Sequence, residues 1–139
     1  MQSTAEFYAV VTQISNILKI AEIYIRKKAP NLSSNYIKRK IIERENLGET
    51  YVGHKTIILH VISTEITANF CLYLFLLNIA KWESLYSKKI HQVNKVMIIC
   101  VNPKLTTPEF KFLLKFFNCR PEQVEHNFGL KKNEIYQIK

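Results

Sequence analysis

Three long apolar runs constrain the fold of this chain more than any other feature. They cover residues 56–62, 70–77 and 93–101, and each is rich in branched or aromatic side chains. Runs of this length and composition are typical of β-strands. Because apolar and polar residues do not alternate within them, both faces of each strand must be covered by other parts of the chain. The runs therefore predict an α/β sandwich with these strands at its centre.

Helices at both ends of the chain are predicted to supply that cover. Apolar residues recur every three or four positions over residues 12–28, which predicts an amphipathic helix that Pro30 ends. A second helix is predicted to open at Ser33 or Ser34, whose hydroxyls can cap its first turn, and to end at Gly48. Residues 6–11 fit a short strand, although they also fit the beginning of the first helix.

The C-terminal part of the chain carries further helix patterns. Residues 107–118 begin with a capping hydroxyl, a proline and an acid, and apolar residues follow on one helical face. A short helix is predicted over residues 121–128, and Asn133 is predicted to cap a last helical turn that carries Ile135 and Ile138.

Length and composition favour a single domain. The chain has 139 residues, of which 47% are hydrophobic, so one domain over residues 1–139 with its own core is expected. It contains no uninterrupted apolar run of about 18 residues, so no membrane insertion is predicted. The N-terminal residues lack the basic and apolar parts of a secretory signal, and three cysteines cannot complete a disulfide framework. These features predict a cytoplasmic protein.

The net charge of the chain restricts the class of possible binding partners only in part. A formal net charge of +9 suits an anionic partner, such as nucleic acid, a membrane surface or a phosphorylated protein. The basic residues stand in short groups without a helix-turn-helix pattern around them, so direct contact with nucleic acid is not predicted. His91 and His126 have polar neighbours and no ligand spacing, so the sequence predicts neither a metal site nor another cofactor.

The segment that most clearly indicates a chemical function runs from Arg44 to His60. It comprises a helix end, a turn that contains Gly53 and His54, and an apolar strand that leads to His60. A histidine at the mouth of a buried strand can be held as a neutral imidazole nucleophile, which a phosphoryl carrier requires. The alternative is that His60 is an ordinary strand-end histidine whose hydrogen bonds are satisfied.

This segment resembles the enzyme IIA domains of the mannitol and fructose type in the bacterial phosphoenolpyruvate-dependent sugar phosphotransferase system (PTS). Those domains have an Arg-Glu pair, a Thr a few residues later, and then the motif Ile-Gly-x-Gly-Ile-Ala-Ile-Pro-His. Here Arg44-Glu45, Thr50 and residues 52–60 stand in the same register, and the motif ends on His60. The similarity extends over nearly the whole chain, and its specific part is residues 44–60.

The resemblance implies a mixed central sheet of about five strands flanked by helices on both faces, which is the mannitol-type enzyme IIA fold. It also implies that His60 accepts a phosphoryl group from the phosphocarrier protein HPr. The roles of other residues in binding this phosphoryl group are hypotheses. The planar guanidinium of Arg44 is expected to clamp the phosphate, and the Thr50 hydroxyl or the amides of the turn to donate hydrogen bonds to it. His54 is a second candidate within reach of the phosphate.

The chain departs from the family pattern at three positions. Leu59 stands where the family has the proline before the histidine, and Lys55 stands where it has the second glycine. Glu109 stands where family members that carry sugar phosphate flux have a second histidine. A carboxylate there would repel the phosphoryl group, although Glu109 also suits the first turn of a helix.

Three functions follow from the resemblance. The favoured one is a regulatory domain of a bacterial transcriptional regulator or antiterminator with PTS regulation domains, in which phosphorylation of His60 by HPr reports sugar transport. The second is an active phosphotransferase component that passes the group to an enzyme IIB domain, so whether the chain is an enzyme stays open. The third is a degenerate, unphosphorylated basic interaction module. The regulatory function is favoured because His60 and Arg44 are kept while the proline, the second glycine and the second histidine are not.

Overall fold

The computed structural model describes residues 16–104 in full and the backbone course of residues 6–12 and 136–138. Within these ranges the chain forms two helices and six strands. In chain order they are β1 (Glu6–Thr12), α1 (Ile17–Lys28), α2 (Ser34–Glu45), β2 (Tyr51–Gly53), β3 (Thr56–Ile62), β4 (Phe70–Glu83), β5 (Ile90–Val101) and β6 (Tyr136–Ile138). The helices predicted over residues 107–118 and 121–128, together with Glu109 and His126, lie outside the described residues.

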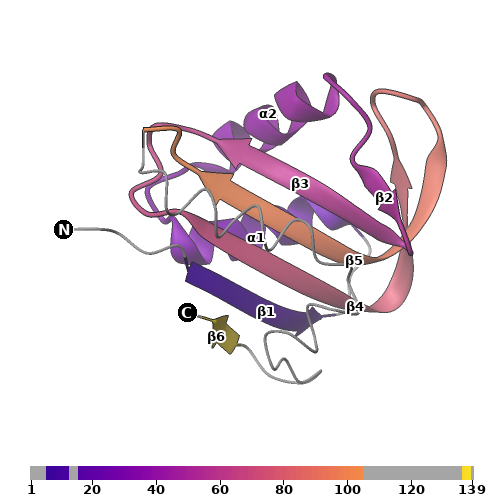
Figure 1. The fold of residues 1–139 in the computed structure, drawn as a ribbon, viewed down its shortest axis with the longest axis horizontal. Coiled ribbons are helices and arrows are strands. Elements are labelled where there is room, and N and C mark those ends of the chain that lie inside the picture. Colours follow the sequence, from indigo (N-terminus) through magenta and orange to yellow (C-terminus); the bar gives the residue numbers. More distant parts are fainter. Residues whose placement is uncertain (1–5, 13–15, 105–135, 139) are drawn as a thin grey trace.

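All six strands join one mixed sheet in the order β2-β3-β5-β4-β1-β6 (Figure 1). The two pairs β3–β5 and β1–β4 are parallel, whereas β4–β5 and the pairs of the short strands β2 and β6 are antiparallel. The predicted α/β fold with a mixed sheet is therefore confirmed. The predicted count of about five strands is slightly off. Four strands of seven or more residues form the centre, and two strands of three residues each flank them.

Both described helices cover the same face of the sheet (Figure 1). The apolar stripe of α1, which includes Ile17, Ala21 and Ile25, packs into one core with Ile37 and Ile41 of α2. The same core takes in every second residue of β3, namely Ile57, Leu59 and Val61, and the inward residues of β4 and β5. Cover on both faces by helices was predicted, and the described helices account for one face only.

The other face of the sheet is buried as well. Cys71, Tyr73, Met97 and Ile99 alternate with the helix-side residues of β4 and β5, and each is at most 1% exposed. Burial on both faces is the physical reason why the central apolar runs do not alternate. His60 lies on this second face, because Leu59 and Val61 on either side of it point into the helix-side core.

Several element bounds differ from those predicted. The first helix begins at Ile17 instead of residue 12, because β1 continues to Thr12 and Asn16 caps the helix by accepting a hydrogen bond from the Lys19 amide. Ser33 caps α2 in the same way, as predicted, but that helix ends at Glu45 and not at Gly48. The prediction of a last helical turn was wrong, because residues 136–138 form strand β6, which pairs with β1.

The turn between β2 and β3 carries backbone strain. His54 and Lys55 have φ values of 53° and 55°, a conformation that favours glycine. Lys55 stands where the resembled family has glycine. We therefore expect Lys55→Gly to raise the free energy of unfolding by about 0.5 to 1 kcal/mol. Glycine adopts the left-handed conformation without strain, and this gain exceeds the extra conformational entropy that glycine loses on folding. Urea unfolding measures this change.

Gly53 supplies the matched comparison for that measurement. Its φ is 87°, and a Cβ added there would meet nothing within 4 Å, so Gly53→Ala tests backbone conformation without a steric clash. We expect Gly53→Ala to lower the free energy of unfolding by about 1 kcal/mol. A loss of stability in Lys55→Gly would contradict the proposed strain.

Candidate functional site

His60 lies two residues before the end of β3, on the face of the sheet opposite α1 and α2. It pairs with Ile99 of β5, and Ile99 in turn pairs with Cys71 of β4, so buried residues lie beside it in the same row of the sheet. The His60 side chain is half-buried, and its Nδ1 atom is fully buried. The exposed surface of this side chain therefore lies on atoms other than Nδ1.

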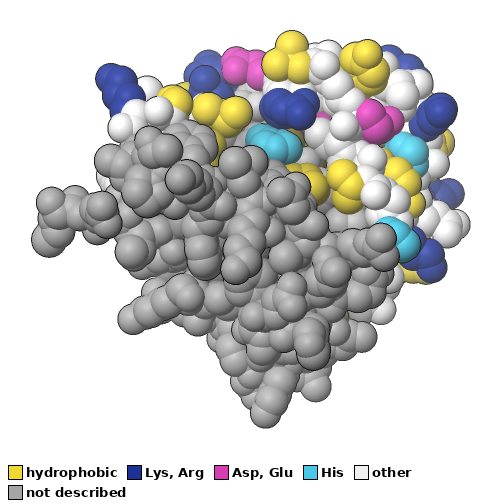
Figure 2. Space-filling model, in the orientation of Figure 1, with side chains coloured by type: hydrophobic (Ala, Val, Ile, Leu, Met, Phe, Trp, Pro, Cys, Tyr) yellow, Lys and Arg dark blue, Asp and Glu magenta, His cyan; other side chains and the backbone are white. Residues whose placement is uncertain are grey.

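Arg44 comes from the last turn of α2, which packs along β3. Strand β2 pairs only with Thr56 and Ile57 at the beginning of β3, and no described strand pairs with the same edge farther along. Among the described strands, none therefore stands beside this edge of β3 at His60. Figure 2 shows histidine and basic side chains next to one another on this face of the molecule.

Burial and this arginine act together on the imidazole. Desolvation by burial lowers the pKa of His60, and the positive charge of Arg44 lowers it further, to about 4. At pH 7 roughly one molecule in a thousand then carries a protonated ring. The arrangement provides a neutral imidazole with a guanidinium nearby. Such a ring can form a covalent bond to an electrophile whose negative charge the arginine stabilises.

Thr50 has a different role from the one expected. It is buried, and its hydroxyl lies 2.7 Å from both carboxylate oxygens of Glu45, to which it donates its proton. The amides near the turn are also used internally. Those of Thr50 and Tyr51 donate to the Glu49 carboxylate, and that of Lys55 donates to the Tyr51 hydroxyl. Neither Thr50 nor these amides are available as donors to a group on His60.

Glu45 is a buried acid that the sequence analysis did not single out. It is 3% exposed, and burial raises the pKa of its carboxyl, against the effect of the Thr50 hydrogen bond and of Arg44. Ile37, Ile41 and Glu45 follow one another at four-residue spacing and are all buried. An acid on the apolar stripe of a helix was the available sign that its side chain needs a partner.

The Thr50 hydroxyl is expected to stabilise the fold through Glu45. Thr50→Val keeps the shape of the side chain but leaves the buried carboxyl without this donor, so we expect a loss of about 2 kcal/mol in the free energy of unfolding. Chemical denaturation measures it. Thr67→Val, at an exposed threonine, is the control and should change stability by less than about 0.5 kcal/mol. Equal effects of the two substitutions would contradict the role of Thr50.

A second polar group, which we call the Glu49 cluster, consists of Glu49, Tyr51, Ser87 and His91. The Ser87 hydroxyl donates to Glu49 at 2.5 Å, His91 Nε2 lies 3.5 Å from the same carboxylate, and the His91 ring stacks on Tyr51 at 4.0 Å. Partial burial pushes the pKa of Glu49 up, but the hydrogen bonds from Ser87 and the Tyr51 amide, together with the nearby Ser84 and His91 side chains, bring it down to about 2. The cluster ties the loop after α2 to the β4–β5 hairpin.

His54 does not join His60. It lies exposed in the turn before β3, whereas His60 lies near the far end of the strand. At about 3.3 Å per residue, four residues separate Thr56 from His60 by about 13 Å, and His54 lies farther still. His54 is therefore out of reach of a phosphate on His60, contrary to the expectation. Within the described ranges, no three His, Cys, Asp or Glu side chains are grouped as metal ligands.

Comparison with known families decides what kind of domain carries this site. The sequence model of the family described as "Phosphoenolpyruvate-dependent sugar phosphotransferase system, EIIA 2" matches residues 8–136. The chain belongs to this family. The EIIA 2 match confirms the predicted resemblance, including its extent over nearly the whole chain. No curated protein sequence matches it.

A solved structure supports the fold of this EIIA 2 domain. The nitrogen regulatory protein IIA-Ntr from Neisseria meningitidis superposes with a TM-score of 0.62 over 84% of this chain and 82% of its own chain, at 15% sequence identity. At this identity the match supports the architecture alone. Among the described helices of the EIIA 2 domain, none combines the length and apolar character needed to cross a bilayer.

Proposed function

We propose that this EIIA 2 domain is a regulatory, cytoplasmic phosphoryl acceptor, in which HPr phosphorylates His60 and the added charge signals the state of sugar transport. The observation that carries the proposal is the half-buried imidazole of His60, whose pKa of about 4 reflects burial and the neighbouring Arg44. A ring that stays neutral at physiological pH keeps its nucleophilic lone pair. A guanidinium beside it suits the roughly −2 charge of a phosphoryl group.

The proposed transfer uses Nε2 as the nucleophile. With the ring proton on the buried Nδ1, the lone pair of Nε2 forms the new bond to phosphorus. The bond between phosphorus and the donor side chain of HPr breaks at the same time, and its electron pair stays with HPr, which then takes up a proton from solvent. Arg44 would stabilise the charge on the transferred oxygens and on the product.

The regulatory role rests on departures from the family pattern. Glu109 replaces the second histidine of members that carry sugar phosphate flux, and Leu59 and Lys55 replace the proline and a glycine. The acceptor and its arginine are kept, which suits a charge switch better than rapid turnover. IIA-Ntr of Neisseria meningitidis is itself described as a nitrogen regulatory protein, so the fold includes a regulatory member. Placement beside PTS regulation domains in a transcriptional regulator or antiterminator is part of this proposal.

Incubation with phosphoenolpyruvate, the first enzyme of the system and HPr tests the proposal. We expect the intact mass to rise by one phosphoryl group, the adduct to be acid-labile, and fragmentation to map it to His60. Omission of HPr should prevent labelling. If no phosphate is gained with all components present, the domain is a basic interaction module and not an acceptor.

Onward transfer separates the regulatory role from an active carrier. We expect the purified phosphorylated domain to lose its phosphoryl group to an enzyme IIB domain slowly or not at all. An authentic mannitol-type enzyme IIA in the same assay is the positive control. Rapid transfer from this chain to the IIB domain would make it a phosphotransferase component and contradict the regulatory role.

A further inference from the structure

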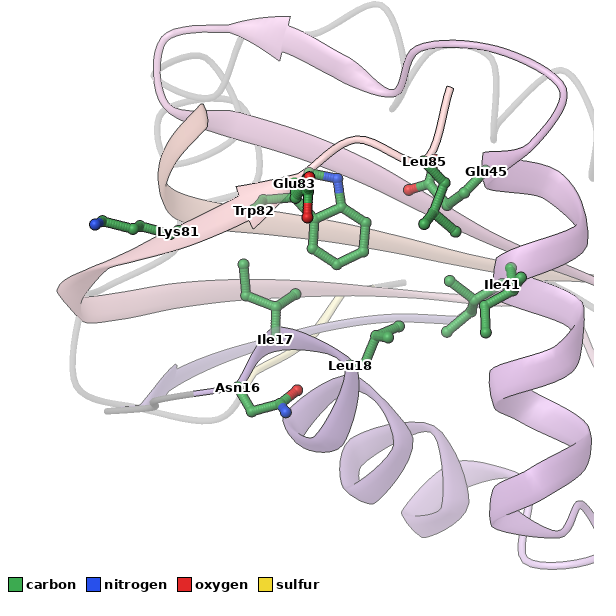
Figure 3. A pocket seen from close by; sticks show the side chains of 10 residues that line it. Asn16, Ile17, Leu18, Ile41, Glu45, Lys81, Trp82, Glu83 and Leu85 are labelled. Atoms are coloured by element: carbon green, nitrogen blue, oxygen red, sulfur yellow. The ribbon is translucent and has the colours of Figure 1, made fainter. Parts of the chain in front are cut away.

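A pocket of about 300 Å³ opens on the helix side of the sheet, away from the face that carries His60. It lies between the beginning of α1, the end of α2 and the end of β4, and Figure 3 shows the Trp82 ring standing over Ile17 and Leu18, with Ile41 across from it. Most of its walls are apolar, and its volume is about that of ten water molecules. This is the lower end of the size range of small-molecule sites.

Trp82 contributes a buried hydrogen-bond donor to the lining of the pocket. The residue is 7% exposed, and its indole nitrogen Nε1 is buried without an acceptor in the described part of the chain. Buried donors of this kind nearly always have a partner in folded proteins. An occupant of the pocket that brings an acceptor would supply the missing bond, because the indole group can only donate.

The remaining polar walls restrict the charge of an occupant. Glu45 lies at one end beside Leu85, where it is almost fully buried, and Glu83 also lines the pocket. These carboxyls disfavour an anion. Lys81 belongs to the lining but is exposed, and Figure 3 shows its side chain directed away from the Trp82 ring, so it provides little compensation. A cation would lose its hydration in a mostly apolar space, which costs several kcal/mol unless a paired charge meets it.

We propose that this pocket binds a small uncharged molecule with an apolar body and a carbonyl or similar acceptor that pairs with the Trp82 indole N–H. The apolar body packs against Leu18 and Ile41, and the acceptor lies at the end of the pocket near Glu83, where Figure 3 shows the indole nitrogen of Trp82. This site is separate from His60, since the two lie on opposite faces of the sheet. Its test is therefore independent of phosphorylation.

Trp82 is also the reporter for the test, because the chain contains one tryptophan. Its indole N–H gives a single cross-peak in a nitrogen–proton NMR spectrum of the labelled full chain. Titration with acetophenone, a small aromatic ketone, should move this peak in a saturable way, with a Kd on the order of 1 mM. Ethylbenzene has the same kind of apolar body without an acceptor and should bind about fivefold more weakly. Benzoate, which is charged, should not produce a saturable shift.

Two matched substitutions on α1 locate the site. Leu18 and Ile20 are both partly buried and pack against the core, but only Leu18 lines the pocket. Leu18→Phe should weaken acetophenone binding about tenfold, whereas Ile20→Phe should leave it unchanged. In Trp82→Phe, ligand-observed NMR should show that acetophenone no longer binds better than ethylbenzene. An unsaturable indole shift, equal binding of the two compounds to the unmodified chain, or equal losses in the two α1 variants would overturn the proposal.

Discussion

His60→Gln is expected to abolish phosphorylation of this EIIA 2 domain by phosphorylated HPr. Glutamine fills a similar space but has no ring nitrogen with a nucleophilic lone pair. Loss of a nucleophile of this kind lowers the rate by a factor on the order of 1,000 or more. Intact-mass spectrometry over a time course, with phosphoenolpyruvate, the first enzyme and HPr present, measures the loss.

Two controls accompany this substitution. His54→Gln changes an exposed histidine at the opposite end of β3 and should leave the rate unchanged. His60→Gln should also unfold cooperatively, because the side chain is half-buried at the sheet surface and does not belong to the helix-side core. Labelling that persists in His60→Gln would show that another residue accepts the phosphoryl group. Collapse of the fold would instead make His60 structural.

Arg44→Met is expected to slow the same transfer about 100-fold, because it removes the positive charge that we propose to stabilise the phosphoryl oxygens. Methionine preserves much of the apolar stem of arginine, so the packing at the end of α2 should change little. The substitution should also raise the pKa of His60 toward its usual range, since Arg44 contributes to its lowering. Single-turnover labelling at fixed concentrations of phosphorylated HPr measures the rate.

Arg39→Met and Arg44→Lys test the reason for that effect. Arg39 is an exposed arginine on the same helix whose guanidinium lies over the Tyr36 ring, so its loss should leave the labelling rate unchanged. Arg44→Lys keeps the charge but not the planar fork, and should fall between the unmodified chain and Arg44→Met. Equal rates for Arg44→Met and Arg39→Met would show that Arg44 does not take part in the transfer.

The centre of the fold was predictable from the sequence because burial determines residue choice there most strongly. The runs at residues 56–62, 70–77 and 93–101 all lie in strands, and Ser33 caps α2 as predicted. Strands β4 and β5 extend beyond these runs, because their hairpin reaches toward solvent and takes up polar residues that interrupt the apolar pattern. Strand β2 was missed, since three residues that include a glycine are too few to display a period.

The candidate site was predictable in part. His60 and Arg44 came from the motif, and the charge of Arg44 contributes, after burial, to the lowered pKa of His60. The motif could not reveal that the Thr50 hydroxyl donates a hydrogen bond to Glu45, because the partner of a hydroxyl depends on how the helix end packs against the strand. The Glu49 cluster depends on residues in separate elements, and Ser87 lies 38 positions from Glu49 along the chain. No local pattern records such a contact.

We infer that the fold holds His60 as a neutral imidazole near Arg44. A lowered pKa means that the folded state favours the neutral ring, so this histidine should take up its proton only well below the usual range. An NMR titration of the histidine ring signals, with His60 assigned from the spectrum of His60→Gln, measures this directly. We expect a midpoint near pH 4 for His60. A midpoint at about 6.5 or above would contradict the claim, because the ring would then be neither desolvated nor close to the guanidinium.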